Sequence, residues 1–468
     1  MESTTLLPFK NRLKSAQVAL DGFPWLLATV LYTLSWGWSL LRPNTLYWDD
    51  WAYIYNKPKS YLNQIFVDTG LPPWRALIDQ ELIAVGYWTI PVLTFLFFFA
   101  SGIALHLILK KIIFLNQAQI NFTILIFLIA PVNHARIALV MFGYTTSYFL
   151  FFVAWAIVIR HTKTRSFFLA AILFFWSFMT HSFLFFYLIP LAHFVYSRYT
   201  GSRSKPIEKI YIAKVLVLWV LPAFYYALRH FYWHPTDEFL WYHKISGIGT
   251  LRGLQVIIIG LLAIIPYEFL RLRKKTNGKK INSLIIPWLI AGSGLFPYFA
   301  SANIDVKSVF TIASGWNSRH LMLTPLGASL LLSAFIFSLT LTFSRAIRPI
   351  VLALLTSINI FFGAQYYLDS LKKQELTELI AETDQIETNS EVIFADQTKM
   401  FNGRFANYSD NELNIYVENA GKTVKSISGK STCDDIESGY EIRLNSEKSF
   451  SGALLSRNLG LYFEISKC

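Results

Sequence analysis

Long apolar segments recur along the first 367 residues of this chain, and they constrain its fold more than any other feature. At least nine of them reach about the 20 residues that a helix needs to cross the hydrocarbon core of a bilayer. The 468 residues are 54% hydrophobic and 17% aromatic, with a mean hydropathy of +0.41. A soluble protein of this size cannot bury so much apolar surface. We therefore predict an all-α polytopic membrane protein.

The apolar segments predict about eleven transmembrane helices, followed by a polar tail. The predicted spans are 22–41, 88–109, 118–132, 144–160, 166–180, 182–198, 210–228, 250–270, 281–300, 321–342 and 348–367. Lys10, Arg12 and Lys14 precede the first span without a small-residue cleavage site, so we expect a retained span rather than a signal peptide.

Lysine and arginine are distributed unequally between the two sets of loops, which predicts the orientation of the bundle. One set holds roughly twice the basic residues of the other, and basic loops stay in the cytoplasm. That set comprises the N-terminus, 110–111, 160–165, 198–209, 271–280 and 345–348. With an odd number of spans, the N-terminus is cytoplasmic and the C-terminal tail is extracytoplasmic. The net charge of +13 follows from these loops and does not indicate nucleic-acid binding.

The polar tail, residues 368–468, is predicted to form a small extracytoplasmic domain after a transmembrane domain of residues 1–367. Leu376–Asn389 has helical spacing. Short alternating runs that are typical of strands occur at 391–394, 413–417, 440–444 and 461–465. We expect an α+β or mostly β fold. Cys433 and Cys468 both lie in this tail, where a disulfide and two free thiols are both compatible with the sequence.

Two adjacent carboxylates follow the first predicted span, in the segment Trp48-Asp49-Asp50-Trp51. Ionised groups beside hydrocarbon are costly and usually mark a path for a substrate or an ion. Trp48, Trp51 and Tyr53 suit the membrane–water interface, where one end of an aromatic ring can be wet, and they are candidate substrate-binding residues. An aspartate can instead cap a helix that begins at Trp51, but one carboxylate suffices for that.

The acidic pair belongs to a predicted outer loop, residues 42–87, that is longer than a simple connection requires. Pro72-Pro73-Trp74 predicts a short interfacial helix that begins near Pro73. Arg75 would lie in its first turn and is a further candidate substrate-binding residue. The length of this loop and its acidic pair indicate that the working face of the protein is extracytoplasmic.

This arrangement of a long first span, an acidic pair, interfacial helices and a second span resembles the GT-C class of glycosyltransferases. These are integral membrane enzymes that use polyprenyl-phosphate sugars. Asp49-Asp50-Trp51-Ala52-Tyr53-Ile54 is similar to the Asp-Asp-Ala-Tyr-Ile stretch of cell-wall arabinofuranosyltransferases, and aminoarabinose transferases and protein O-mannosyltransferases carry Asp-Glu there. Residues 70–79 are loosely similar to the Gly-Arg-Pro-Leu region of bacterial O-antigen glucosyltransferases. The motifs cover 42–80 and 315–326, and the topology covers most spans.

The resemblance implies an inverting transfer of a sugar from a polyprenyl-phosphate donor to a hydroxyl of a lipid-linked or cell-surface glycan. The acceptor would be lipopolysaccharide, O-antigen or another cell-wall polysaccharide, at the outer face of a bacterial inner membrane. A carboxylate must take the proton of the attacking hydroxyl. By resemblance either Asp49 or Asp50 supplies this base, and Asp49 is preferred because it aligns with the first acid of the family pair. Asp50 would orient the acceptor or a cation. No cofactor is expected; a divalent metal is possible but not favoured, because hard cations need more than two oxygen ligands.

Several cations at the ends of outer loops are candidates to bind the donor phosphate, whose negative charge grows as it leaves. Arg319-His320 opens the tenth span, and the residues after it resemble the Arg-Tyr-x-x-x-x-Pro element of several GT-C enzymes. An arginine there can equally snorkel to lipid headgroups. Arg229 and Lys244 flank an aromatic loop that is as compatible with a plain interfacial segment. Arg136 could face the same cavity or complete a helix C-terminus.

Two histidines are candidate substrate-binding residues. His134 lies beside Arg136 at the outer end of the third span, and His234 lies in the aromatic outer loop. His230 and His234 have the i, i+4 spacing of a helical metal pair. No third ligand stands at a suitable spacing and Pro235 interrupts the helix, so no zinc site is predicted.

Two other functions fit the sequence less well than a transferase does. O-antigen polymerases and ligases use polyprenyl-diphosphate glycans and place essential arginines and histidines in a large later loop, whereas the later loops here are about twenty residues long. Transporters and flippases tend to show internal repeats, broken spans and charges at mid-membrane. The sequence has no convincing repeat, and its polar residues gather at one face, so both alternatives are disfavoured.

Overall fold

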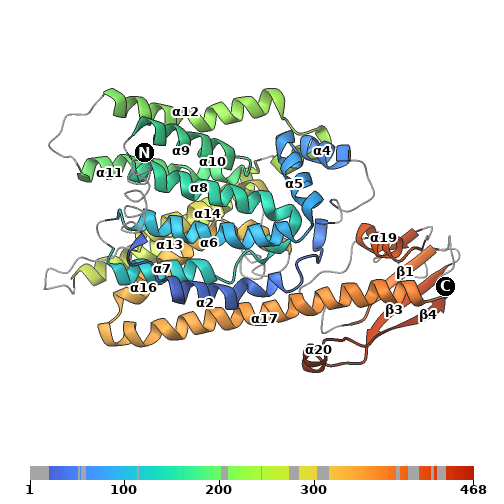
Figure 1. Cartoon of the computed structure of the whole chain (residues 1–468). Coiled ribbons are helices and arrows are strands. Elements are labelled where there is room, and N and C mark those ends of the chain that lie inside the picture. Colours follow the sequence, from blue (N-terminus) through green and yellow to red (C-terminus); the bar gives the residue numbers. More distant parts are fainter. Residues whose placement is uncertain are drawn as a thin grey trace, which may run out of the picture.

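The computed structural model places a small C-terminal domain at one end of a helical bundle (Figure 1). We call that end the outer end. The structure describes residues 20–50, 53, 59–112, 115–161, 163–201, 209–243, 245–273, 284–302, 316–385, 391–398, 410–422, 426–428 and 439–468. All structural statements below concern these residues.

The bundle is built from apolar helices joined by short segments. They are α2 (Trp25–Trp36), α6 (Thr89–Leu109), α7 (Gln117–Ile129), α8 (Phe142–Arg160), α9 (Thr164–Ser177), α10 (Ser182–Phe186), α11 (Leu188–Gly201), α12 (Lys209–Tyr232), α13 (Gly247–Arg273), α14 (Ile285–Ala302), α16 (Thr324–Ser338) and α17 (Leu341–Glu382). Among the described residues, α6, α8, α12, α13 and α17 are long and apolar enough to cross a membrane. The other apolar helices are shorter, so the count of eleven spans stays a prediction.

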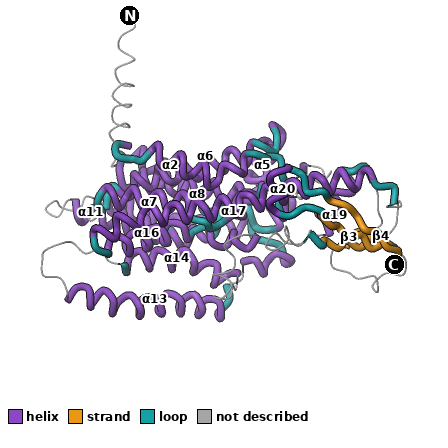
Figure 2. The backbone as a smooth tube through the Cα atoms, turned by 90° about the horizontal axis from the view of Figure 1, so that it is seen from below, coloured by secondary structure: helices purple, strands orange, loops and turns teal. Residues whose placement is uncertain are grey.

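The helices differ in how much of their apolar surface faces protein. Phe98 on α6, Phe127 on α7 and Tyr148 on α8 form a stacked aromatic cluster at the buried centre, with ring centroids 5.3 to 6.0 Å apart. By contrast, α12 and α13 expose most of their apolar side chains, and Figure 2 shows α13 at the margin of the bundle, beside α14. Exposed apolar surface on this scale is stable in lipid rather than in water.

The C-terminal domain is a small α+β unit, as the sequence predicts. Its sheet has the strand order β2-β1-β3-β4. The strands and helices are β1 (Glu391–Asp396), α19 (Asp410–Asn419), β2 (Ser426–Ser428), β3 (Tyr440–Ser446), α20 (Phe450–Ser456) and β4 (Leu461–Lys467). β1 pairs in parallel with β2 and β3, and β3 pairs antiparallel with β4. Cys468 is disulfide-bonded, and the other cysteine of the chain, Cys433, lies outside the described residues.

The predicted strand at 413–417 is wrong, because this segment belongs to helix α19. Leu413, Tyr416 and Val417 are buried against the sheet and the end of α17. Their i, i+3, i+4 spacing is that of one helical face. Asp410 and Glu412 lie in the first turn, where carboxylates stabilise a helix N-terminus. A segment of only five residues fits the alternation of a strand as well as the spacing of a helix, so the sequence did not distinguish the two.

Helix α17 joins the two parts of the molecule without a break. It is 42 residues long and continues from the predicted eleventh span into the C-terminal domain. The domain boundary predicted at 367/368 falls inside this helix. Leu376 and Ile380, near its end, belong to the core of the small domain. Figure 1 shows α17 running the length of the bundle and ending at the sheet, so one helix sets the position of the C-terminal domain.

Candidate active site

Three segments that are distant in sequence meet at the outer end of the bundle. They are the turn η2 (Trp48–Asp50), the paired turns η3 (His134–Ile137) and η4 (Leu139–Met141), and the turn η6 (Trp316–Leu321). The amide of Val140 donates to Asp50 Oδ1 at 3.0 Å, which joins η4 to η2. The amide of Ala135 donates to Ser318 Oγ at 2.8 Å, which joins η3 to η6. The predicted acidic pair and the predicted Arg319-His320 pair are therefore brought to one place.

Asp50 is the buried member of the acidic pair. Its side chain is inaccessible to solvent, and its second oxygen, Oδ2, accepts from the amide of Tyr47 at 2.9 Å. Burial raises the pKa of Asp50 to about 7, although hydrogen bonds from the backbone of Val140, Leu139 and Tyr47 oppose the shift. Oδ1 thus joins two outer segments, Oδ2 closes the turn that carries the pair, and the buried side chain has no surface accessible to a substrate.

Asp49 is the exposed member of the pair. Partial burial among its neighbours raises the pKa of Asp49 above the usual carboxyl value, the positive charge of Arg319 lowers it, and the negative charge of Glu412 raises it. Asp49 therefore lies within the electrostatic field of one cation from η6 and one carboxylate from the C-terminal domain. A carboxylate that is accessible and has a raised pKa is suited to accept a proton.

The backbone turns sharply just before Asp49. Trp48 has a positive φ of 50°, which few residues other than glycine adopt. Its ring packs edge-on against Tyr366 at 6.0 Å and lies 5.8 Å from the ring of Tyr47. These contacts, together with the buried carboxylate of Asp50, hold the strained turn and keep the two aspartates in different surroundings. Strain of this kind is characteristic of functional sites.

Arg319 and His320 lie in η6 and are both partly buried. Burial, together with the neighbouring charge of Arg319, lowers the pKa of His320 to about 3. The imidazole is therefore neutral at physiological pH, so a positive charge for an anionic ligand would come from Arg319. The His320 ring lies edge-on to Tyr298 at 5.8 Å.

The second predicted cationic pair, His134 and Arg136, is buried inside the bundle. The Arg136 guanidinium lies 3.4 Å from the ring centroid of Trp36 and 3.8 Å from that of Phe98, and only 3% of the residue is exposed. His134 is fully buried, and its Nε2 lies 3.3 Å from Asn359 Oδ1. This corrects the expectation that the two residues face a donor, because surrounding rings enclose both.

Residues 42–87 contain two helices, α4 (Lys59–Asp68) and α5 (Pro73–Val85), and α5 begins at Pro73 as predicted, while their interfacial location stays a prediction. Arg75 is buried, with its guanidinium 5.1 Å from the ring of Tyr144. The Tyr53 hydroxyl donates to Asp79 Oδ2 at 2.9 Å. Burial raises the pKa of Asp79 to about 6, which Arg75 and Tyr53 counteract. Tyr53 and Arg75 thus brace the loop from inside, and Asp79 was missed although it lies at i+4 from Arg75.

The aromatic outer loop after α12 packs against the first outer loop. Arg229 Nε donates to the carbonyl of Gly70 at 3.4 Å, and the amide of Thr236 donates to the carbonyl of Asp68 at 3.0 Å. Gly70 has a φ of 73°, so the turn that receives Arg229 favours glycine. His234 is exposed. Two other predicted residues, Lys244 and Trp51, lie outside the described residues.

Sequence reasoning missed Lys373 and Glu412, which connect the C-terminal domain to the site. Lys373 Nζ lies 3.1 Å from Glu412 Oε1 and 3.4 Å from Asp369 Oδ2. It also donates to the carbonyl of Leu46 at 2.6 Å and lies 4.8 Å from the ring centroid of Tyr47. The i, i+4 spacing of Asp369 and Lys373 was the available signal, but nothing in the sequence places Glu412 beside them.

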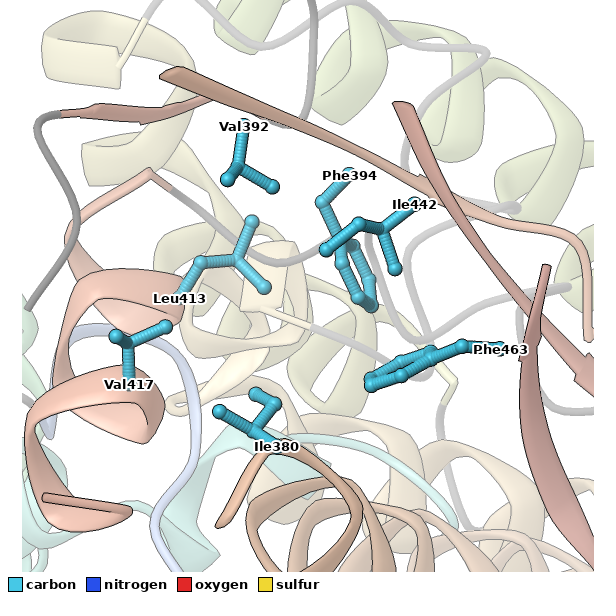
Figure 3. Close-up of a pocket in the computed structure, with 7 residues that line it drawn as sticks. All are labelled: Ile380, Val392, Phe394, Leu413, Val417, Ile442 and Phe463. Carbon is cyan, nitrogen blue, oxygen red and sulfur yellow. The ribbon is translucent and has the colours of Figure 1, made fainter. Parts of the chain in front are cut away.

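Two cavities differ in their suitability for a ligand. A void of about 10 Å³ lies inside the C-terminal domain, and Figure 3 shows the apolar side chains around it, among them Ile380, Leu413 and Phe463. Because it is about as small as a single water molecule needs and is wholly apolar, it is a packing gap. The other cavity, of about 420 Å³, opens between residues 41–46, α17 and Tyr416. Within the described part of the chain, no group of three or more His, Cys, Asp or Glu side chains is placed to hold a metal ion.

The fold and the site define a polytopic helical membrane protein with a small α+β domain over its outer end. No family model and no curated protein matches the sequence. Among solved structures, the chain is similar to a crystal structure of the Archaeoglobus fulgidus oligosaccharyltransferase in complex with zinc and sulfate. The similarity covers 89% of this chain and 67% of that chain, with 10% sequence identity and a TM-score of 0.38. A similarity this weak carries no functional argument, so function must be inferred from the side chains.

Proposed function

We propose that this protein is a membrane-embedded inverting glycosyltransferase of the GT-C type. It moves a sugar from a polyprenyl-phosphate donor to a hydroxyl of a lipid-linked or cell-surface glycan, such as lipopolysaccharide, O-antigen or another cell-wall polysaccharide. The reaction takes place at the outer face of a bacterial inner membrane, with the N-terminus in the cytoplasm and the C-terminal domain outside. Donor and acceptor both reach the site from the surrounding lipid.

This proposal rests on the different surroundings of the two aspartates. Asp49 is exposed and lies in the field of Arg319, whereas both oxygens of Asp50 are occupied by backbone amides. Sugar transfer requires a base for the attacking hydroxyl and positive charge for the departing phosphate. An accessible carboxylate and an arginine at one end of a membrane bundle supply both.

In the proposed reaction, Asp49 takes the proton from the acceptor hydroxyl as its oxygen bonds to the anomeric carbon. The bond between that carbon and the phosphate oxygen breaks on the opposite face, and the polyprenyl phosphate leaves as an anion. Arg319 contacts that phosphate, to which a guanidinium can donate two parallel hydrogen bonds. His320, which is neutral, adds a hydrogen bond without charge. Asp50 is a positioning residue that fixes the turn carrying Asp49.

The remaining predicted residues have supporting roles in this proposal. Trp48 contacts the acceptor, and Arg229 and His234 belong to the rim formed by the aromatic outer loop. Trp51 and Lys244 stay predicted contacts of the acceptor and the phosphate, and both lie outside the described residues. The reaction needs no metal ion, since Arg319 meets the phosphate charge. Chelation with EDTA should therefore leave the transfer rate unchanged, and restoration of a lost rate by added Mg²⁺ or Mn²⁺ would contradict that part of the proposal.

Substitution of the two aspartates tests the proposal in the full-length protein reconstituted in nanodiscs. The assay follows labelled sugar from polyprenyl-phosphate glucose and polyprenyl-phosphate arabinose to extracted lipid-linked glycan. Asp49→Asn should lower the rate by about 10²–10⁴-fold, the contribution of a general base. Asp50→Asn should cost less and act through stability. Asp237→Asn, an exposed acid in another outer loop, is the matched control.

Two outcomes of this experiment would contradict the proposal. Full activity of Asp49→Asn with normal folding would remove the base, and transfer only from a polyprenyl-diphosphate glycan would favour a polymerase or ligase. Thermal unfolding of each purified variant distinguishes lost chemistry from lost fold.

A further inference from the structure

The larger cavity lies where three parts of the molecule meet, and the proposed reaction does not use it. Its volume is about 420 Å³, within the range of small-molecule sites. One wall is the segment that follows the first predicted span, the second is the outer part of α17, and the third is α19. The lining residues are Leu41, Arg42, Pro43, Asn44, Thr45, Leu46, Ser370, Lys373, Gln374 and Tyr416.

Residues with polar side chains are in the majority around the cavity. Ten residues line it, and all but Leu41, Pro43 and Leu46 have polar side chains. Arg42 and Lys373 are its two charged residues, and no acid is among the described residues that line it. Amides, hydroxyls and cations together suit a ligand with several hydroxyl groups and a negative charge.

The two cations of the wall differ in their partners. Lys373 is neutralised by Asp369 and Glu412, at 3.4 and 3.1 Å. Arg42 bonds to neutral groups: its Nη1 donates to Ser370 Oγ at 3.4 Å, its Nη2 donates to Gln374 Oε1, and its guanidinium lies 5.7 Å from the ring of Tyr367. These two hydrogen bonds leave other N–H groups of its five for a ligand. Arg42 therefore supplies positive charge that no carboxylate of the described residues balances through an ion pair.

We propose that this cavity binds a phosphoryl-bearing ligand, with Arg42 as its anion contact. Asn44, Thr45 and Gln374 are the hydrogen-bond partners for the rest of the ligand. A phosphoryl group can be carried by a glycan or by a phospholipid headgroup, and the position of Arg42 after the first predicted span gives both access. Binding here does not depend on the transfer reaction, and Asp49 is not part of the wall.

The experiment measures binding to the full-length protein in phosphatidylcholine nanodiscs. Glucose 1-phosphate and glucose are the soluble probes, titrated by isothermal calorimetry, and phosphatidylglycerol is the lipid probe, followed by native mass spectrometry. Glucose 1-phosphate or phosphatidylglycerol should bind, and Arg42→Gln should weaken that binding about ten-fold or more, as expected for a charge-assisted hydrogen bond. Arg443→Gln is the control, because Arg443 pairs with Glu441 outside the cavity.

A second variant guards against misfolding of Arg42→Gln. Asn44→Asp places a negative charge on an exposed residue of the wall and should also weaken binding of the phosphoryl probe. Binding of glucose 1-phosphate alone assigns the site to a glycan, and binding of phosphatidylglycerol alone assigns it to a headgroup. The proposal is overturned if neither probe binds, if both variants bind as the parent does, or if glucose binds as tightly as its phosphate. Asp49→Asn should keep full binding, which separates this proposal from the proposed transfer.

Discussion

The turns η3 and η6 each carry a histidine and an arginine at the outer end of the bundle, and they differ in what surrounds the arginine. They touch through the bond from Ala135 to Ser318. Arg136 of η3 is enclosed by the rings of Trp36 and Phe98, whereas Arg319 of η6 stays partly exposed and acts on Asp49.

The two turns show that a position at the outer end of the bundle does not by itself determine the role of an arginine. The faces of aromatic rings stabilise a desolvated guanidinium by about 2 kcal/mol or more. Arg136 consequently acts as part of the core, even though its own turn lies at the outer end. Arg319 is partly exposed, and its positive charge acts on the carboxylate of Asp49. The difference predicts separate consequences for the two arginines.

The largest effect is expected from Arg319→Gln. Removing a donor that meets growing negative charge lowers a rate by about 10²–10³-fold, so the transfer rate should fall by this amount while the melting temperature stays near that of the parent. Arg319→Lys should recover part of the rate, since it keeps the charge and loses the paired geometry. Arg457→Gln, at an exposed position of the C-terminal domain, is the control. An unchanged rate in Arg319→Gln would contradict the proposal that Arg319, unlike Arg136, contacts the donor phosphate.

Arg136→Ala should have the opposite signature. Loss of a large side chain packed between rings is expected to lower the free energy of unfolding by about 2–4 kcal/mol. The transfer rate of the folded fraction should not change, because aromatic rings enclose Arg136. Thermal unfolding and the transfer assay on the same preparation check both statements. A stable variant with a large loss of rate would place Arg136 in the donor site after all.

The same contrast between an enclosed and an open group applies to the acidic pair and gives a pH-dependent test. The folded-state pKa of Asp50 is about 7, above its ordinary value of 3.8. Its contribution to stability is therefore complete below pH 4 and is lost as the pH rises through 7, on the order of a few kcal/mol. Melting temperatures between pH 4 and 8 should vary less in Asp50→Asn than in the parent. Equal variation would show that Asp50 does not titrate in this range.

The smallest effect is a displaced pH–rate profile. The base must be deprotonated, so the rate should rise with pH through the pKa of Asp49. Glu412 raises that pKa and Arg319 lowers it. Glu412→Gln should therefore move the acid limb of the profile to lower pH, and Arg319→Gln should move it to higher pH. If the acid limb moves in the same direction in both variants, a group other than Asp49 controls that limb of the pH–rate profile.

The sequence predicts local features of this protein well because their causes are local. The apolar runs become helices, α5 begins at Pro73, and strands form at β1, β3 and β4. The segment 413–417 fails because a five-residue run supports both periods, and burial against the sheet selects the helix.

The site could be predicted only where its residues stand in one segment. Asp49 and Asp50 are evident as a pair, but their different roles depend on Val140, whose amide comes from another turn. The bond between Lys373 and Leu46 joins residues 327 positions apart. No local pattern encodes such contacts, and the enclosure of Arg136 by aromatic rings is likewise a product of tertiary packing.

Because α17 is an unbroken helix, its length sets both the orientation and the height of the C-terminal domain. Each residue added between its membrane part and Lys373 would turn everything beyond by about 100° and push it outward by about 1.5 Å. An insertion that restores the angle therefore adds several turns of height, so no insertion leaves Glu412 and the wall of the large cavity where they are. This stretch should tolerate substitutions on its exposed face but not an insertion or deletion, because a continuous helix has no flexible segment that could absorb the change.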